Sequence, residues 1–270
     1  MYRSMWRGML NFGLVSMPVK LYSAVSSKTV HFNHLHTADH TRVYTKRFCL
    51  ADDEEVAYDE VVRGYEIAPE RYVVVEDDEL AALAPEFTHT IEIEDFVELQ
   101  EIDRIYLDQS YHVVPDRGGA KSYHLLMHAM GETGKVAIAR VVLRSRERLV
   151  VVRPREDALL MTTMSYGDEV HSTSELRELD DVEMHLSERE LEVASRLVHS
   201  LAEPFEISRY RDSYREAILD LIDRKAGGEQ IEAQKVERRQ PVETTDVMGA
   251  LRASLAQAEE REEELSRSAA

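Results

Sequence analysis

The chain has a single cysteine and no long apolar run. Cys49 alone cannot form an internal disulfide and is too little for a cysteine-based zinc knuckle, which agrees with a reducing compartment. No stretch of about 18 apolar residues is present, so the sequence predicts no membrane span. Residues 1–20 also lack the apolar core and cleavage site of a signal peptide. We therefore expect a cytoplasmic protein.

Several catalytic signatures are missing as well. Residues 131–136 resemble a phosphate-binding loop only superficially, because the first glycine and the terminal hydroxyl residue are misplaced. No nucleophile-elbow serine and no HExxH metalloprotease motif occur. The sequence therefore predicts no catalytic residue, no metal and no cofactor.

What the chain has in excess is acid, and that charge is sorted by segment. The formal net charge is −19, yet residues 1–50 carry seven basic against one acidic side chain, and residues 111–155 carry nine against three. Residues 51–110 carry three against twenty, and the remainder is also acidic. This pattern favours a folded protein with a positive interior or face that binds a polyanion and a negative exterior; the alternative is local variation in a chain whose acidity serves solubility.

Short apolar strands dominate the first two thirds of the chain. Strand patterns occur within residues 1–21, at 73–75, 91–94 and 113–114, and as a pair at 135–143 and 149–153 around a turn at 144–148. Helices are expected at 122–130 and, more weakly, at 78–83. Many short strands indicate a barrel or a sandwich. Within 135–143, alternate residues share an apolar face, and Arg140 and Arg144 lie on the other face, where arginines can point at a ligand.

The pattern becomes helical from residue 187. Ser187 and Glu190 form a capping box, and apolar residues recur at helical spacing until Pro204. A second helix, with Tyr210 in its apolar stripe, is expected to end at 227–228. A polar linker follows, then a short helix within 246–265 that cannot be stable alone and resembles a partner-docking helix.

A histidine-rich segment raises an enzymatic alternative. His31, His34, His36 and His40 precede Cys49, and His34 and His36 would share one face of a strand. Imidazoles at this density can bind zinc, which would suit a zinc-dependent hydrolase or nuclease, although no four-ligand set of usual spacing is completed. A third alternative is an acidic adaptor that binds only proteins, through the helices after Ser187 and the tail.

The order of motifs along residues 2–228 resembles the prokaryotic Ku proteins. No single motif carries this resemblance. The matching segments are Trp6-Arg7-Gly8, Phe12-Gly13-Leu14-Val15, Met17 to Tyr22, Tyr44 to Cys49, Arg63 to Glu66, Lys121-Ser122-Tyr123, Ala137 to Arg140, Pro204-Phe205 and Tyr210 to Tyr214.

The resemblance implies a mixed, mainly β fold. A Ku-type β-barrel core would occupy residues 1–185, with an insert at about 30–83 that forms a DNA-encircling bridge. Residues 186–228 would be a helical arm for dimerisation, and residues 229–270 a C-terminal linker and partner-docking tail. Two departures stand out: Asp52 replaces a second cysteine that some relatives have, and the chain ends acidic rather than lysine-rich.

The function implied by the resemblance is DNA repair and recombination by non-homologous end joining. The protein would be a homodimeric ring that threads double-stranded DNA ends without reading sequence, and would recruit and stimulate a dedicated ATP-dependent DNA ligase through its C-terminal region. It would be nucleoid-associated and not an enzyme. Its phosphate contacts are expected to be basic side chains of both positive segments: Lys20, Lys28, Arg42, Lys46, Arg47, Arg140, Arg144 and Arg146.

Overall fold

The structure is a computed structural model that describes residues 3–83, 89–179, 186–228 and 247–268. Contacts divide the chain into two units, Met1–Ser172 and Thr173–Ala270. This division falls somewhat before the boundary expected at about residue 185, and the functional division into core, arm and tail stays a prediction.

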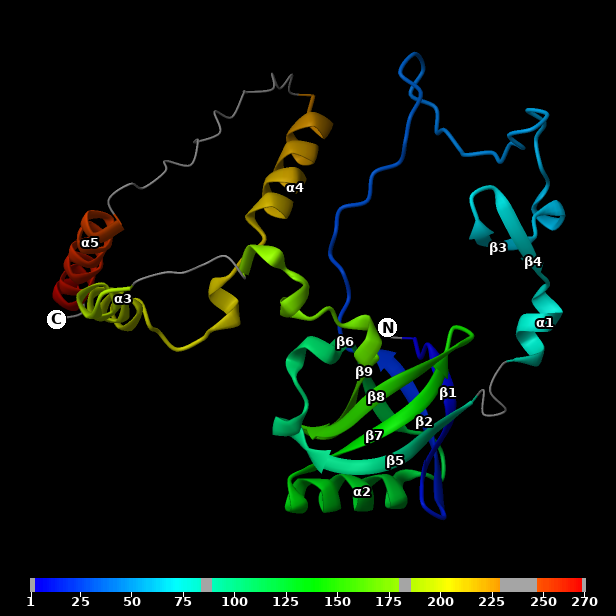
Figure 1. The fold of residues 1–270 in the computed structure, drawn as a ribbon, viewed down its shortest axis with the longest axis horizontal. Helices are drawn as coiled ribbons and strands as arrows, with labels where there is room; N and C mark the ends of the chain where they lie inside the picture. Colours follow the sequence, from blue (N-terminus) through cyan, green and yellow to red (C-terminus); the bar gives the residue numbers. More distant parts are fainter. Residues whose placement is uncertain (1–2, 84–88, 180–185, 229–246, 269–270) are drawn as a thin grey trace. The chain divides into compact units, whose positions relative to one another are not determined.

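The first unit contains a closed seven-stranded barrel (Figure 1). The strand order is β1-β2-β6-β9-β8-β7-β5, and every neighbouring pair is antiparallel except β1 and β5. The mainly β expectation is thereby confirmed as a barrel rather than a sandwich. The strands are β1 (Trp6–Phe12), β2 (Val15–Ser23), β5 (Thr90–Glu98), β6 (Leu107–Pro115), β7 (Lys135–Leu143), β8 (Arg146–Arg155) and β9 (Ala158–Met164).

Alternation along the strands builds the core. On β7, Ala137, Ala139, Val141 and Leu143 are all buried and point into the barrel, as their spacing predicts. The inward rows of the other strands supply further fully buried side chains, among them Leu10, Ile91 and Met161, so the interior is filled. The barrel interior is therefore a packed core and not a channel.

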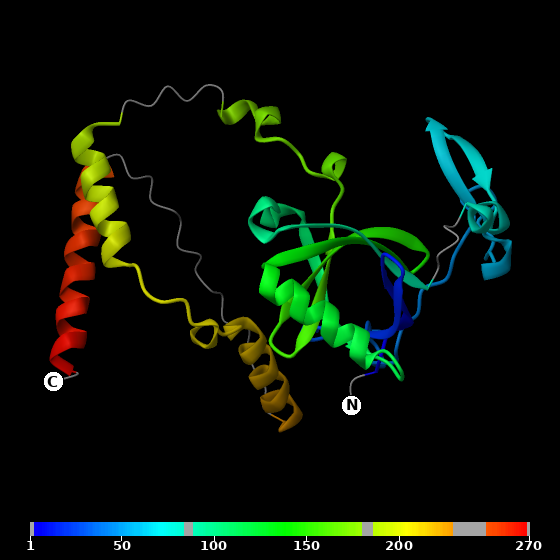
Figure 2. The same ribbon diagram turned by 90° about the horizontal axis from the view of Figure 1, so that it is seen from below.

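A helix, α2 (Ala120–Thr133), packs against this core (Figure 2). Tyr123, Leu126 and Met130 lie on one helical face and are buried within the core cluster. The helix ends at Gly134, which adopts the left-handed conformation (φ 68°) that glycine enters without steric cost. The expected helix at 122–130 is confirmed.

The turn between β7 and β8 is shorter than the sequence suggested. β8 begins at Arg146, so only Arg144 and Ser145 form the turn, and not residues 144–148. Both turn residues have positive φ, 52° and 63°. Two-residue hairpin turns of this type match the twist of the flanking strands, which explains why pairing continues to the turn.

The segment between β2 and β5 forms a two-stranded sheet of its own. It comprises β3 (Arg63–Ala68) and β4 (Arg71–Val75), followed by α1 (Asp77–Ala82), and the expected strand at 73–75 and helix at 78–83 are confirmed. Apolar side chains on the sheet stay open to solvent: Tyr65 is 70% exposed and Val74 55%. A two-stranded sheet is marginal by itself, so this one needs a further surface to cover it.

The second unit is helical. Its helices are α3 (Glu188–Ser200), α4 (Ser213–Ala226) and α5 (Val247–Ser268). The capping box of Ser187 with Glu190 is present. α4 begins after the N-cap Asp212, so Tyr210 precedes the helix instead of joining its stripe. α3 and α5 pack together (Figure 2). Leu255 on α5 is buried.

Short 3-10 turns complete the description. They are η1 (Tyr58–Glu60), η2 (Leu99–Glu101), η3 (Arg104–Tyr106), η4 (Gly167–Glu169), η5 (Thr173–Glu175), η6 (Arg177–Leu179) and η7 (Ile207–Arg209).

The expected linker around Pro241 lies outside the described residues. Within the described ranges, every helix is too short or too polar to cross a bilayer.

Candidate nucleic-acid interface

The eight basic residues predicted to contact DNA come from three places. Lys20 lies on β2, and Arg140, Arg144 and Arg146 gather on the β7–β8 hairpin. The segment between β2 and β5 carries the remaining four, which are Lys28, Arg42, Lys46 and Arg47. The sequence thus located one true cluster, because a hairpin brings together residues that are close along the chain.

Arg140 lies on the outer face of the barrel and is held by two carboxylates. Its Nε donates to Glu94 Oε1 at 2.7 Å, and one terminal nitrogen donates to Glu147 Oε1 at 2.9 Å. Hydrogen bonds to Glu147 and Glu94 raise the pKa of the Arg140 guanidinium above its ordinary value. Two carboxylates around one guanidinium leave this patch negative, so Arg140 is poorly placed to attract a phosphate.

Arg144 does not share a strand face with Arg140, contrary to the expectation from alternation. It occupies the β7–β8 turn, where the chain reverses, and its side chain is exposed. Arg146 pairs with Leu143 and is also exposed. Among the described residues, neither arginine has a carboxylate within ion-pair distance.

Lys20 is held more tightly than expected. Its Nζ lies 2.6 Å from Asp116 Oδ1, and both side chains are about three quarters covered. The hydrogen bond from Lys20 is the main cause that lowers the pKa of Asp116. The pair joins Lys20, within β2, to Asp116, which directly follows β6, so Lys20 has a structural role that its sequence context did not reveal.

Of the four insert residues predicted to contact DNA, one is held by a carboxylate, and the other three have no carboxylate partner among the described residues. Lys46 Nζ lies 2.5 Å from Glu55 Oε2, whereas Arg47 stacks its guanidinium over the Tyr58 ring at 5.1 Å from the centroid. Lys28 and Arg42 are exposed and, within the described part of the chain, have no carboxylate partner. Arg47, Lys28 and Arg42 thus keep charge available for an anion.

Arg148 was not selected from the sequence, and the structure gives it a distinctive place. It lines a small polar cavity together with Arg144, Gln109 and Thr163. The signal was present in the sequence: residues 146, 148, 150 and 152 share one strand face, and Val150 and Val152 are buried in the barrel. An arginine on a buried row is unusual enough to single out.

The part of the chain that the structure describes gives the zinc alternative no support. No group of three or more histidine, cysteine, aspartate or glutamate side chains that could hold a metal ion occurs within the described ranges. The expected strand across His34 and His36 is wrong, because only an isolated bridge between Leu35 and Arg42 forms there. The histidines therefore lie along an irregular segment, where a strand cannot align them.

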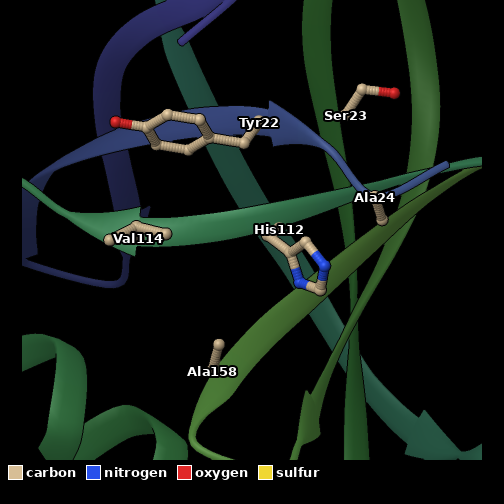
Figure 3. A pocket seen from close by; sticks show the side chains of 6 residues that line it. All are labelled: Tyr22, Ser23, Ala24, His112, Val114 and Ala158. Carbon is tan, nitrogen blue, oxygen red and sulfur yellow. The ribbon is translucent and has the colours of Figure 1, made fainter. Parts of the chain in front are cut away.

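A larger cavity of about 440 Å³ lies on the outer face of the barrel (Figure 3). Tyr22 on β2 and His112 on β6 both line it; the two residues are register partners, so their side chains lie on the same side of the sheet. The other lining residues are small or apolar: Ser23, Ala24, Val114 and Ala158. The described residues that line this cavity include no lysine or arginine, so they are not suited to bind a phosphate.

The closed barrel, its long insert between β2 and β5, and the helices that follow define the class of protein. A family model described as the Ku70/Ku80 beta-barrel domain matches residues 11–193, which is more than half of the chain. The chain belongs to the Ku family of non-homologous end-joining proteins.

Curated relatives match over nearly the whole chain, and each bears the name Non-homologous end joining protein Ku. The relative from Anaeromyxobacter sp. (strain K) is 49% identical over 265 residues, covering 98% of this chain and 88% of that protein. The relative from Archaeoglobus fulgidus is 36% identical and covers 94% and 98%. The relative from Symbiobacterium thermophilum is 43% identical over 95% of this chain, which spans only 63% of that longer protein.

Proposed function

We propose that this protein binds the ends of broken double-stranded DNA as a homodimeric ring and recruits and stimulates a dedicated ATP-dependent DNA ligase. The observation that carries this proposal is membership of the Ku family over nearly the full length of the chain. In this proposal the ring has no catalytic activity, and the chemistry of joining belongs to the ligase. The protein would act in the cytoplasm on the nucleoid.

Electrostatics support a DNA contact that ignores sequence. Phosphate contacts from lysine and arginine position a protein on duplex DNA without reading base edges. Of the eight predicted contacts, the five without a carboxylate partner among the described residues are the better candidates: Lys28, Arg42, Arg47, Arg144 and Arg146. The strongly acidic remainder would repel DNA elsewhere, which favours binding in one orientation.

The proposal assigns a separate role to each of three parts of the chain. Residues 1–185 would form the barrel core, and the insert at about 30–83 would form the bridge. Its uncovered apolar sheet supports a role in contact with another surface. Residues 186–228 would form the dimerisation arm, supported by exposed apolar side chains such as Val198 and Tyr214. Residues 229–270 would dock the ligase.

A mobility-shift comparison tests the proposal. A linear duplex and a closed circle of the same sequence are each titrated with the full-length protein at low and at physiological salt. Binding to the linear duplex alone, weakening as salt rises, is the expected result, because a phosphate-lined ring loads only from ends. Equal binding to circles would refute the ring, and no binding to either would favour the protein-only adaptor.

A further inference from the structure

A small cavity lined by two arginines, Arg144 and Arg148, lies at one end of the barrel. The cavity measures about 110 Å³. That is far below the roughly 300–1,000 Å³ of a pocket for a drug-sized ligand, so only a small ion with a few waters has room. Among the described residues, the lining comes from four strands (β6, β7, β8 and β9), the β7–β8 turn and the segment before β1, and consists of Met5, Asp108, Gln109, Tyr111, Leu143, Arg144, Arg148 and Thr163.

Arg148 belongs to a row that points into the barrel. It is the register partner of Val141, which is buried, and it continues the row of Val150 and Val152. Partners on adjacent antiparallel strands lie on the same side of the sheet, so Arg148 points toward the barrel interior at its open end. Its side chain is half-buried. A charge in such a place is costly unless an opposite charge or hydrogen bonds compensate it.

Arg144 reaches the same cavity from a strained turn. Its φ of 52° lies in the left-handed region, which is unfavourable for a residue with a side chain, and asparagine followed by glycine would fit such a turn better. The next residue, Ser145, is also left-handed, at 63°. The turn therefore keeps an arginine where other residues would make the hairpin more stable.

The neighbouring polar groups suit an anion. Gln109 Oε1 accepts a hydrogen bond from the Tyr111 hydroxyl at 2.9 Å, which leaves the Gln109 amide NH₂ to donate. One carboxylate, Asp108, lines the cavity, and its Oδ2 accepts a long hydrogen bond of 3.5 Å from the Thr163 hydroxyl. Within the part of the chain that the structure describes, neither arginine lies within ion-pair distance of a carboxylate. Two guanidiniums thus outweigh one carboxylate.

We propose that Arg144 and Arg148, with the Gln109 amide, form a phosphate-binding site that holds one phosphate group of the bound DNA. The inference rests on the proposed function, since it names which part of the DNA this end of the barrel contacts. Guanidinium groups bind phosphate in a fixed fork geometry, and two of them at one cavity supply both charge and direction. The cavity thereby acts as an anchor for the backbone, while exposed basic residues contribute long-range attraction.

Two titrations of the full-length protein test the site. Inorganic phosphate is titrated while the guanidinium signals are followed by NMR, and linear duplex is titrated over a range of salt. In the wild type, phosphate is expected to shift the Arg144 and Arg148 signals. Arg148→Gln is expected to abolish the phosphate response. It should also make the plot of log affinity against log salt less steep, by about 0.9 for each DNA phosphate that the variant no longer neutralises. Arg146→Gln, on the same hairpin but outside the cavity, keeps the phosphate response.

A second variant separates binding from folding. Arg144→Asn combined with Ser145→Gly relieves the strained turn, so it is expected to be at least as stable as the wild type while its phosphate response weakens. If phosphate shifts no guanidinium signal in the wild type, or if the response survives Arg148→Gln, the site is refuted. If phosphate binds but Arg148→Gln leaves the DNA salt slope unchanged, the cavity takes a free anion only and the proposal is also refuted.

Further comparisons show which DNA phosphate the site holds. They also distinguish failure of the phosphate site from failure of the proposed function. If Arg148→Gln weakens binding to duplexes with 5′-phosphate and 5′-hydroxyl ends equally, the site holds an internal phosphate of the backbone. An effect confined to 5′-phosphate ends assigns the terminal group. Both results support the site. A wild type that responds to phosphate but binds no linear duplex refutes the DNA assignment together with the proposed function, whereas normal DNA binding with no phosphate response refutes the site alone.

Discussion

Replacing Tyr123 with phenylalanine tests how α2 is attached to the barrel. Tyr123 is 1% exposed, and its hydroxyl donates to the Val113 carbonyl at 2.7 Å and accepts from the Leu159 N–H at 2.7 Å. Val113 and Leu159 are register partners on β6 and β9. The hydroxyl therefore joins two strands to the helix at the edge of their ladder, and its removal leaves two buried backbone groups without a partner.

The structure sets the size of the effect. An unsatisfied buried donor or acceptor costs about 1–3 kcal/mol, so two of them predict that Tyr123→Phe lowers the free energy of unfolding by about 2–6 kcal/mol. Urea unfolding followed by circular dichroism measures it, and an unchanged m-value would show that the surface exposed on unfolding is the same. DNA binding under native conditions should stay unchanged. A decrease below about 0.5 kcal/mol would refute this account of the hydroxyl.

The same hydroxyl predicts a pH dependence. Burial raises the pKa of Tyr123 above its ordinary value, with a smaller opposing effect from the Leu159 hydrogen bond. In the unfolded chain the tyrosine releases its proton near about pH 10, while the folded protein retains it. Its stabilising contribution is therefore complete below about pH 10 and is lost as pH rises through the folded pKa. The stability difference between wild type and Tyr123→Phe should narrow above about pH 10, and a constant difference would contradict the argument.

Three further changes probe the barrel, the basic hairpin and the tail. Gly8→Ala places a Cβ 2.1 Å from the His89 carbonyl oxygen, so β1 must shift, and thermal unfolding should show a destabilisation of about 1–3 kcal/mol. Glu147→Gln removes one of the two carboxylates that hold Arg140. If Arg140 faces the DNA, log affinity should fall more steeply with log salt in this variant; an unchanged steepness removes Arg140 from the interface. Leu255→Glu inserts a charge at a buried position of α5, which packs with α3, and limited proteolysis should then cut the second unit faster while barrel melting stays the same.

Local patterns were sufficient for most of the elements. Alternation across Ala137 to Leu143 identified the inward face of β7, because a strand places every second side chain on the same side whatever surrounds it. The capping pair of Ser187 and Glu190 identified the start of α3 for a similarly local reason. The turn length at Arg144 was missed, since the run of charged residues there has no glycine or asparagine to indicate a two-residue turn.

The sequence by itself determined which elements and charged segments the chain has and in which order they follow: a barrel-forming set of short strands, helices after residue 187, and two basic segments in an acidic chain. Only the tertiary structure decided which charges are available. Arg140 and Arg148 are eight residues apart on one hairpin, yet Glu94 comes from β5 to hold the first, while the second faces a cavity lined by β6 and β9. Partners from distant strands set the charge around each arginine, and those distances exist only once the barrel has closed.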